Sequence, residues 1–318
     1  MKKILRMFLF MIGVCPLFSD AQTYPDRPVK MIVPYPAGGP ADQIARELAN
    51  GLSQALGQTF VIEAKGGGSG VIGTGFVAKA APDGYTLLAG SGAPHIAVPI
   101  FSSNPPFDGI KEFVPILMMI DVPNVMVIGP HIQANTVKEF IALAKTKTLT
   151  YGSSGTGSST HLAGEIFQLE ANVKMTHVPY KGASPVVNDM LGGHVDVSFL
   201  NVSAMLPHLK SGKLRAIGLS AQTRSKALPD VPTLGEQGVP GNTGSWYGLL
   251  APAGTPDSVV RVLYDASVKY FAQPEVRARV EAVGSEIKML NPQQFLAALN
   301  EEKRQLTELN KILNIKMD

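Results

Sequence analysis

The chain has 318 residues, of which 28 are Lys or Arg and 25 are Asp or Glu, so its formal net charge is only +3. A nearly neutral chain without a run of basic residues and interleaved aromatics gives no electrostatic reason to expect nucleic acid as a partner. The single cysteine, Cys15, excludes an intrachain disulfide and a thiolate metal site.

The first 21 residues have the pattern of a secretory signal peptide. Three basic residues precede an apolar stretch, Met7–Phe18, that is too short for a comfortable membrane span. Ser19–Ala21 fits the small-x-small cleavage pattern, so we expect cleavage after Ala21; an uncleaved anchor is the alternative. Lipidation of Cys15 is disfavoured, because Val14 stands where a small residue is expected. Cleavage lowers the formal charge to +1 and leaves no cysteine.

Short apolar segments then alternate with helical periodicity, which is typical of an α/β protein. Many of these segments are almost continuously apolar, which favours strands covered by helices on both faces. The predicted strands are Val29–Tyr35, Thr59–Ala64, Tyr85–Ala89, Val114–Ile120, Val125–Ile128, Leu149–Tyr151, Met175–Pro179, Val195–Leu200, Leu214–Leu219 and Trp246–Ala251. The predicted helices begin at Ala41, about Gly70, Thr136, Thr160, Asp257 and Pro292.

Two interruptions of this pattern predict domain boundaries. Leu228–Gly244 is rich in Pro and Gly, and Asp121–Asn124 breaks an apolar run. They divide the mature chain into a discontinuous lobe, residues 22–123 plus 246–318, and an inserted lobe, residues 124–245.

Two strand-to-helix loops share a plan that favours anion binding. Pro36–Pro40 reads PAGGP and Gly152–Ser159 reads GSSGTGSS, and neither contains Lys or Arg. A helix N-terminus leaves backbone N–H groups unpaired, and the peptide dipoles there favour negative charge. Such a junction binds an anion without a cationic side chain. The sequence therefore predicts two lobes that hold one small anion between them.

A dinucleotide cofactor and a metal ion are both disfavoured. Gly68–Gly73 matches G-x-G-x-x-G, but the next strand ends in Gly90-Ser91, where no acidic residue is present to bind a ribose. A tight turn with close helix packing is the favoured interpretation. The six histidines show no metal-binding spacing, so we expect neither a cofactor nor a metal.

Ser158, Ser159 and His161 allow three interpretations. They suit helix capping, anion binding by hydroxyl and N–H groups, or a Ser–His pair in a secreted hydrolase. The chain has no G-x-S-x-G motif, and His161 falls in the first helical turn, where local geometry rarely supports attack. A serine hydrolase therefore remains the alternative function.

Several other side chains each have two interpretations. Asp42 complements the helix dipole or contacts a ligand hydroxyl, ammonium or bridging water. Asp196 interrupts an apolar strand, so it has a fixed partner or a place in the cleft. Glu301–Arg304 is interpreted as a solvated helix face. Four aromatic residues line a ligand site or belong to the core or rim: Trp246, Tyr247, His95 and Phe101.

A series of motifs runs in order through the mature chain. It includes Ile32–Asp42 (IVPYPAGGPAD), Ala81–Leu87, Gly152–Glu165 (GSSGTGSSTHLAGE), His177–Gly182, Gly193–Asp196, Leu228–Thr233 and Ala251–Pro256. With these motifs the chain resembles the TctC/Bug family, the solute-binding receptors of tripartite tricarboxylate transporters. The resemblance implies a type II, two-lobe periplasmic binding protein of the Venus-flytrap kind, with a discontinuous first lobe. It also implies a monomer without catalytic activity that delivers a small organic carboxylate to a membrane permease.

The resemblance further implies that backbone N–H groups, hydroxyls and ordered water hold the ligand carboxylate. The loop Ser91–Pro99 departs from the family pattern and is expected to face the distal part of the ligand, with Ser91 and His95 as candidates. The matching positions are Ala37, Gly38, Gly39 and Asp42 in one lobe, and Ser153, Gly155, Gly157, Ser158, Ser159, His161 and Asp196 in the other.

Overall fold

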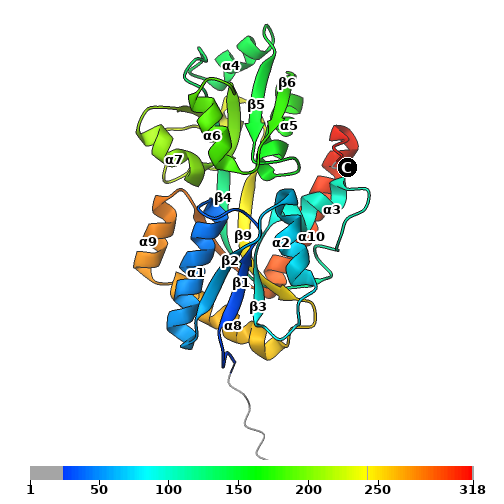
Figure 1. Ribbon diagram of the computed structural model, residues 1–318. Coiled ribbons are helices and arrows are strands. Elements are labelled where there is room, and N and C mark those ends of the chain that lie inside the picture. The colour runs from blue at the N-terminus through cyan, green and yellow to red at the C-terminus, as the bar shows by residue number, and fades with distance from the viewer. Residues whose placement is uncertain (1–23, 242, 317–318) are drawn as a thin grey trace, which may run out of the picture.

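The computed structural model describes residues 24–241 and 243–316, so the signal-peptide prediction lies outside the described residues. Figure 1 shows two α/β halves joined by β4 and β9. The strands are β1 (Val29–Val33), β2 (Phe60–Ala64), β3 (Thr86–Ser91), β4 (Phe113–Ile128), β5 (Leu149–Ser153), β6 (Met175–Pro179), β7 (Val197–Asn201), β8 (Arg215–Ser220), β9 (Gly244–Pro252) and β10 (Glu286–Leu290). The α-helices are α1 (Pro40–Leu56), α2 (Val71–Ala78), α3 (Val98–Phe101), α4 (Val137–Ala144), α5 (Ser159–Ala171), α6 (Ala183–Leu191), α7 (Val202–Lys210), α8 (Asp257–Phe271), α9 (Pro274–Ala282) and α10 (Pro292–Leu313).

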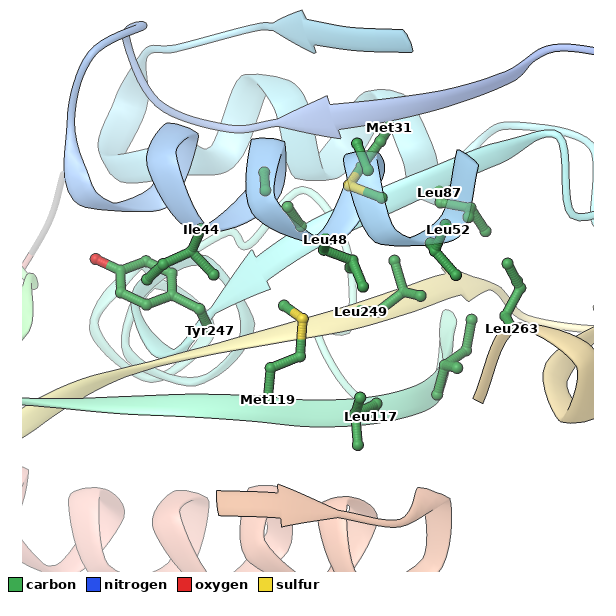
Figure 2. Close-up of a cluster of buried hydrophobic side chains, with 14 of the residues drawn as sticks. Met31, Ile44, Leu48, Leu52, Leu87, Leu117, Met119, Tyr247, Leu249 and Leu263 are labelled. Carbon is green, nitrogen blue, oxygen red and sulfur yellow. The ribbon is translucent and has the colours of Figure 1, made fainter. Parts of the chain in front are cut away.

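The first half is built on the strand order β2-β1-β3-β9-β4. The first three strands are parallel, and β9 runs antiparallel to both β3 and β4. Helices α1 and α8 cover one face, where Leu48 and Leu52 pack in one cluster with Leu263 (Figure 2). Gly51 lets these helices approach closely, because a Cβ there would lie 2.3 Å from the Tyr270 ring.

The second half contains β5 between its parallel neighbours β6 and β7. The end of β4 joins this group, since Asn124 lies opposite Asn201 of β7 and Ser220 of β8. Earlier in β4 the partner is β9, up to the pair Pro123 and Gly244. The partners of β4 therefore change between residues 123 and 124, and one strand serves both halves.

The predicted break at Asp121–Asn124 is wrong as a strand boundary. The two predicted strands Val114–Ile120 and Val125–Ile128 form one continuous β4. Proline and an acidic residue suggested a loop, but Asp121, Val122 and Pro123 keep antiparallel partners on β9. The expected tight turn at Gly68–Gly73 is present as a 3₁₀ turn (Gly68–Gly70) followed by α2. A Cβ on Gly73 would lie 2.7 Å from the Lys65 carbonyl oxygen.

The helix starts agree with the predictions to within about one residue. α1 begins at Pro40 and ends at Leu56, and its C-cap residue Gly57 adopts the left-handed conformation with φ 70°. The prediction omitted β10, a five-residue segment with two charged residues, as well as α3, α6, α7 and α9. Within residues 24–241 and 243–316, no helix combines the length and apolar character needed to cross a membrane.

Candidate ligand-binding site

A cavity of about 750 Å³ lies where the two halves meet. The loops after β1, β3, β5 and β6 all contribute to its wall, as expected where parallel strands end. Further parts of the wall come from β4, α5, β10, the start of β9 and one face of α10. Segments far apart in the chain therefore share one site.

The first anion-binding loop lies at the N-terminus of α1. Gly39 is the N-cap residue and no side chain caps this helix, while Pro40 at the first position has no N–H to satisfy. Ala37 and Gly39 line the cavity. The adjacent Tyr35 hydroxyl is hydrogen-bonded to Ser91 Oγ at 2.7 Å, and burial raises the Tyr35 pKa to about 12, so this hydroxyl stays neutral.

Asp42 stabilises this loop without lining the cavity. Its side chain is buried, and Oδ2 accepts from the Gly38 amide at 3.0 Å and from Arg46 Nε at 2.9 Å. Burial opposes ionisation, but these hydrogen bonds hold the pKa of the carboxyl below its usual range. Neither Asp42 nor Gly38 lines the cavity. The dipole-complementing interpretation thus fits the geometry, with the ring of hydrogen bonds shaping the loop.

The second loop lies at the N-terminus of α5 and is held by its own hydroxyl groups. Ser158 is the N-cap, and its Oγ accepts from the His161 amide at 3.2 Å and donates to the Gly155 carbonyl at 2.6 Å. Gly157, Ser158 and Ser159 line the cavity. Ser153 and Gly155 do not; the Ser153 hydroxyl is buried and bonded to His177 Nε2 at 2.7 Å.

His161 supports the loop from inside the second half. Its Nδ1 accepts from the Gly157 amide at 3.1 Å, and its ring stacks on His177 with centroids 4.1 Å apart. Burial lowers the pKa of both rings to about 4. Neither the Ser158 nor the Ser159 hydroxyl bonds to the His161 ring, since the Ser159 Oγ pairs with Ser245 Oγ at 2.8 Å. This geometry disfavours the hydrolase alternative.

Asp196 has the fixed partners that one of its two interpretations requires. One oxygen accepts from the Thr150 amide at 2.7 Å and the Thr150 hydroxyl at 2.9 Å, and the other lies 2.9 Å from His131 Nε2. Burial opposes ionisation, but these hydrogen bonds lower the pKa of the carboxyl. Asp196 is not part of the cavity wall. Its hydrogen bonds connect β5 to the segment before β7.

A network of amides and hydroxyls forms the floor where strands cross between the halves. The Asn201 amide donates to Asn124 Oδ1 at 2.8 Å and to Ser245 Oγ at 3.2 Å. Asn124 in turn donates to the Ser159 carbonyl at 3.1 Å and to Thr243 Oγ1 at 3.2 Å. Through Ser159, which is bonded to Asn124 and to Ser245, the N-terminus of α5 is linked directly to β4 and β9.

The part of the cavity wall formed by Trp246 and Glu302, which we call the far end, includes a residue that the prediction assigned elsewhere. Glu302 on α10 lines the wall, and its Oε2 accepts from Trp246 Nε1 at 2.7 Å. Burial raises the Glu302 pKa to about 7. The interpretation of Glu301–Arg304 as a solvated face is therefore wrong for Glu302. The signal was present: Phe295, Leu299, Leu306 and Leu309 form a helical stripe whose missing position is 302.

The cavity brings together Ala37, Gly39, Ser91, Gly157, Ser158 and Ser159 from the predicted site. The predicted residues that lie behind this wall are Gly38, Asp42, His95, Ser153, Gly155, His161 and Asp196. Trp246 and Tyr247 line the cavity as one of their interpretations required, whereas His95 and Phe101 are buried in the core beside it. The prediction missed Ser69, Asp121, Lys181, Asn201, Ser245, Lys288 and Glu302.

Solved structures with the same fold include BugD and Rpa4515. BugD, described as a periplasmic binding protein, is 35% identical, with a TM-score of 0.86 over 93% of this chain and 100% of that chain. Rpa4515 of R. palustris, solved with adipate, is 31% identical, with a TM-score of 0.89 over 92% of this chain and 99% of that chain.

Sequence comparisons identify the family of the chain. The model of the TctC family, described as "Tripartite tricarboxylate transporter family receptor", matches residues 44–315. Protein BugT of Bordetella pertussis is 38% identical over 264 residues, which is 82% of this chain and 81% of BugT. The chain therefore belongs to the TctC/Bug family of tripartite tricarboxylate transporter receptors, and the resemblance in its motifs is confirmed.

Proposed function

We propose that this receptor captures a small organic carboxylate between two lobes and delivers it to the permease subunits of a tripartite tricarboxylate transporter. One observation carries the proposal: the N-termini of α1 and α5 both line one cavity, and neither loop contains Lys or Arg. Backbone amides at two helix N-termini suit a carboxylate. The related Rpa4515 was solved with adipate, which supports this class of ligand.

We assign residues 22–123 plus 246–318 to the first lobe and residues 124–245 to the second. The change in strand partners between residues 123 and 124 supports the first boundary. The second boundary follows the irregular segment between β8 and β9. Two such lobes close by hinge motion around a ligand.

We further propose that residues 1–21 are removed in export and that the mature protein is a periplasmic monomer. The periplasmic description of BugD supports this location. Mass spectrometry of the periplasmic fraction should find an N-terminus at Gln22, and sedimentation should give the mass of one chain. A retained leader or a dimer would contradict these assignments.

We propose that the receptor performs no catalysis. The hydroxyls of Ser158 and Ser159 are engaged in the cap and in the contact with Ser245, away from the His161 ring. A serine-reactive phosphonate should leave the protein unlabelled. Labelling that disappears in Ser158→Ala or Ser159→Ala would restore the hydrolase alternative.

The binding site itself is tested by adding a side chain where the fold has room. A Cβ on Gly39 would meet only the Pro36 carbonyl oxygen, at 3.8 Å, so Gly39→Val should fold and project into the cavity. Gly235 is similarly open, with only Thr233 Oγ1 at 3.7 Å, but it lies outside the cavity wall. In calorimetric titrations with mono-, di-, tri- and aromatic carboxylates, Gly39→Val should abolish binding and Gly235→Val should preserve it. Equal affinities would refute the proposed site.

A further inference from the structure

Glu302 presents an unused hydrogen-bond acceptor at the far end of the cavity. Its Oε2 is held by Trp246 Nε1 at 2.7 Å. Its Oε1 has no hydrogen-bond partner among residues 24–241 and 243–316. Because Trp246 fixes one oxygen, the orientation of the other is restricted as well. The carboxyl is thus held in place in the cavity wall with one acceptor position open.

Gly92 leaves the space beside this carboxyl uncovered. A Cβ at residue 92 would lie 2.7 Å from Glu302 Oε1 and 3.1 Å from Trp246 Nε1, so a larger residue would collide with the pair. Gly92 also lines the cavity. Glycine at this position therefore permits the carboxyl to form part of the cavity wall.

The charges nearby disfavour a second carboxylate of the ligand. Asp121 lines the same end and repels the charge on Glu302. Lys288, which also lines the cavity, lies 3.8 Å from Asp121 and 3.5 Å from Glu286, so acidic groups already surround it. The burial of Glu302 and Asp121 raises the pKa of both carboxyls, which reflects a shortage of compensating positive charge.

Apolar side chains line the cavity around these polar groups. They come from β4, α5, β10 and α10: Met118, Leu162, Ile166, Leu290, Leu306 and Leu309. These side chains favour an apolar body in a ligand that contacts both Glu302 and the helix N-termini.

We propose that the far end of the cavity binds an O–H or N–H donor at the end of an amphipathic monocarboxylate, with Glu302 Oε1 as the acceptor. The inference rests on the proposed function and narrows its ligand class to hydroxy or amino acids with an apolar body. A dicarboxylate is disfavoured, because its second charge would face Glu302 and Asp121. The helix N-termini bind through backbone amides, whereas this end of the cavity discriminates between ligands through an acidic side chain.

The test compares acids that differ only at the far end. Linear acids of four to eight carbons, and phenyl analogues, are titrated at pH 8 with a terminal methyl, hydroxyl, ammonium or carboxylate group. At pH 8 Glu302 is largely ionised, given its pKa of about 7. The hydroxyl and ammonium forms should bind at least tenfold more tightly than the dicarboxylates. Trp246 is the only tryptophan and is bonded to Glu302, so its fluorescence reports occupancy at this end.

Glu302→Gln provides the matched variant and Glu301→Gln its control on the neighbouring, exposed position. The amide keeps an acceptor for Trp246 but can donate to a carboxylate, so the preference against dicarboxylates should fall at least fivefold in Glu302→Gln alone. If dicarboxylates bind wild-type protein best, or if both variants behave alike, the inference is overturned while the proposed function stands. If none of the acids binds, the proposed function fails and the inference fails with it.

Discussion

Replacing His95 with Phe should make the receptor more resistant to acid. His95 is only 1% exposed and packs against Phe113 and Trp246, with ring centroids 4.9 and 5.7 Å away. Its Nδ1 lies 3.1 Å from the Ser91 carbonyl oxygen, and its buried Nε2 has no partner among the described residues. An imidazolium would leave one N–H unsatisfied, which agrees with the burial that lowers the His95 pKa to about 4.

The sign of the effect follows from the two pKa values. The folded-state pKa lies below the unfolded-state value of about 6.5, so the unfolded chain takes up the proton first as the pH falls. Stability is therefore complete above pH 6.5 and is lost between pH 6.5 and about 4. At pH 5 this single residue costs about 2 kcal/mol. His95→Phe removes that loss but gives up a hydrogen bond worth about 1 kcal/mol. The variant should thus be about 1 kcal/mol less stable at pH 7 and about 1 kcal/mol more stable at pH 5.

Urea unfolding of residues 22–318, followed by circular dichroism at both pH values, measures this difference directly. His194→Phe, at an exposed position, serves as the control. If the stability difference between wild type and His95→Phe stays constant from pH 7 to pH 5, burial does not keep His95 neutral, and the reasoning is refuted.

Three further predictions concern the crossing strands and the helix packing. Asn201→Ala removes donors to Asn124, Ser245 and the Val122 carbonyl, and should lower the unfolding free energy in urea by about 1–3 kcal/mol; an unchanged midpoint would contradict the network. Ser69→Ala removes the bond to the Thr156 carbonyl between the halves, and should increase the scattering radius of the unliganded protein without lowering its melting temperature. Gly164→Ala places a Cβ 2.3 Å from the Tyr151 ring and should lower the free energy of unfolding by about 1–3 kcal/mol. In the control Gly75→Ala, where the new Cβ lies 3.4 Å from Phe107, stability should be unchanged or increased. Equal effects of the two substitutions would argue against the packing.

The elements and loops that depend on local sequence could be predicted well. Proline, glycine and serine residues allowed the starts of α1 and α5 to be predicted, because capping and turn conformations depend on a few neighbouring residues. The convergence of these two helix ends on one cavity also followed, since both loops leave parallel strands at the same type of edge.

The residues missed by the prediction depend on tertiary partners. β10 is short and pairs only with β4, so its strand character comes from that neighbour. The sequence predicts an exposed Glu302 because its neighbours in the chain are charged. A hydrogen bond from Trp246, 56 residues earlier, instead holds it in the cavity wall. Asp196 shows the converse: a carboxyl in an apolar segment correctly signalled a fixed partner, but the partners, Thr150 and His131, were not identifiable from sequence.

The crossing strands also explain how the site and the joint between the halves depend on each other. Ser159 lines the cavity, and its hydroxyl bonds to Ser245 at the start of β9, while its carbonyl accepts from Asn124 on β4. The proposed ligand carboxylate at the N-terminus of α5 would therefore contact a residue that is bonded to both strands joining the halves. Because buried networks of this kind act as units, changes in the position of α5 will alter the hydrogen bonds at the crossing. Ligand binding and the relative orientation of the halves consequently share the same few hydrogen bonds.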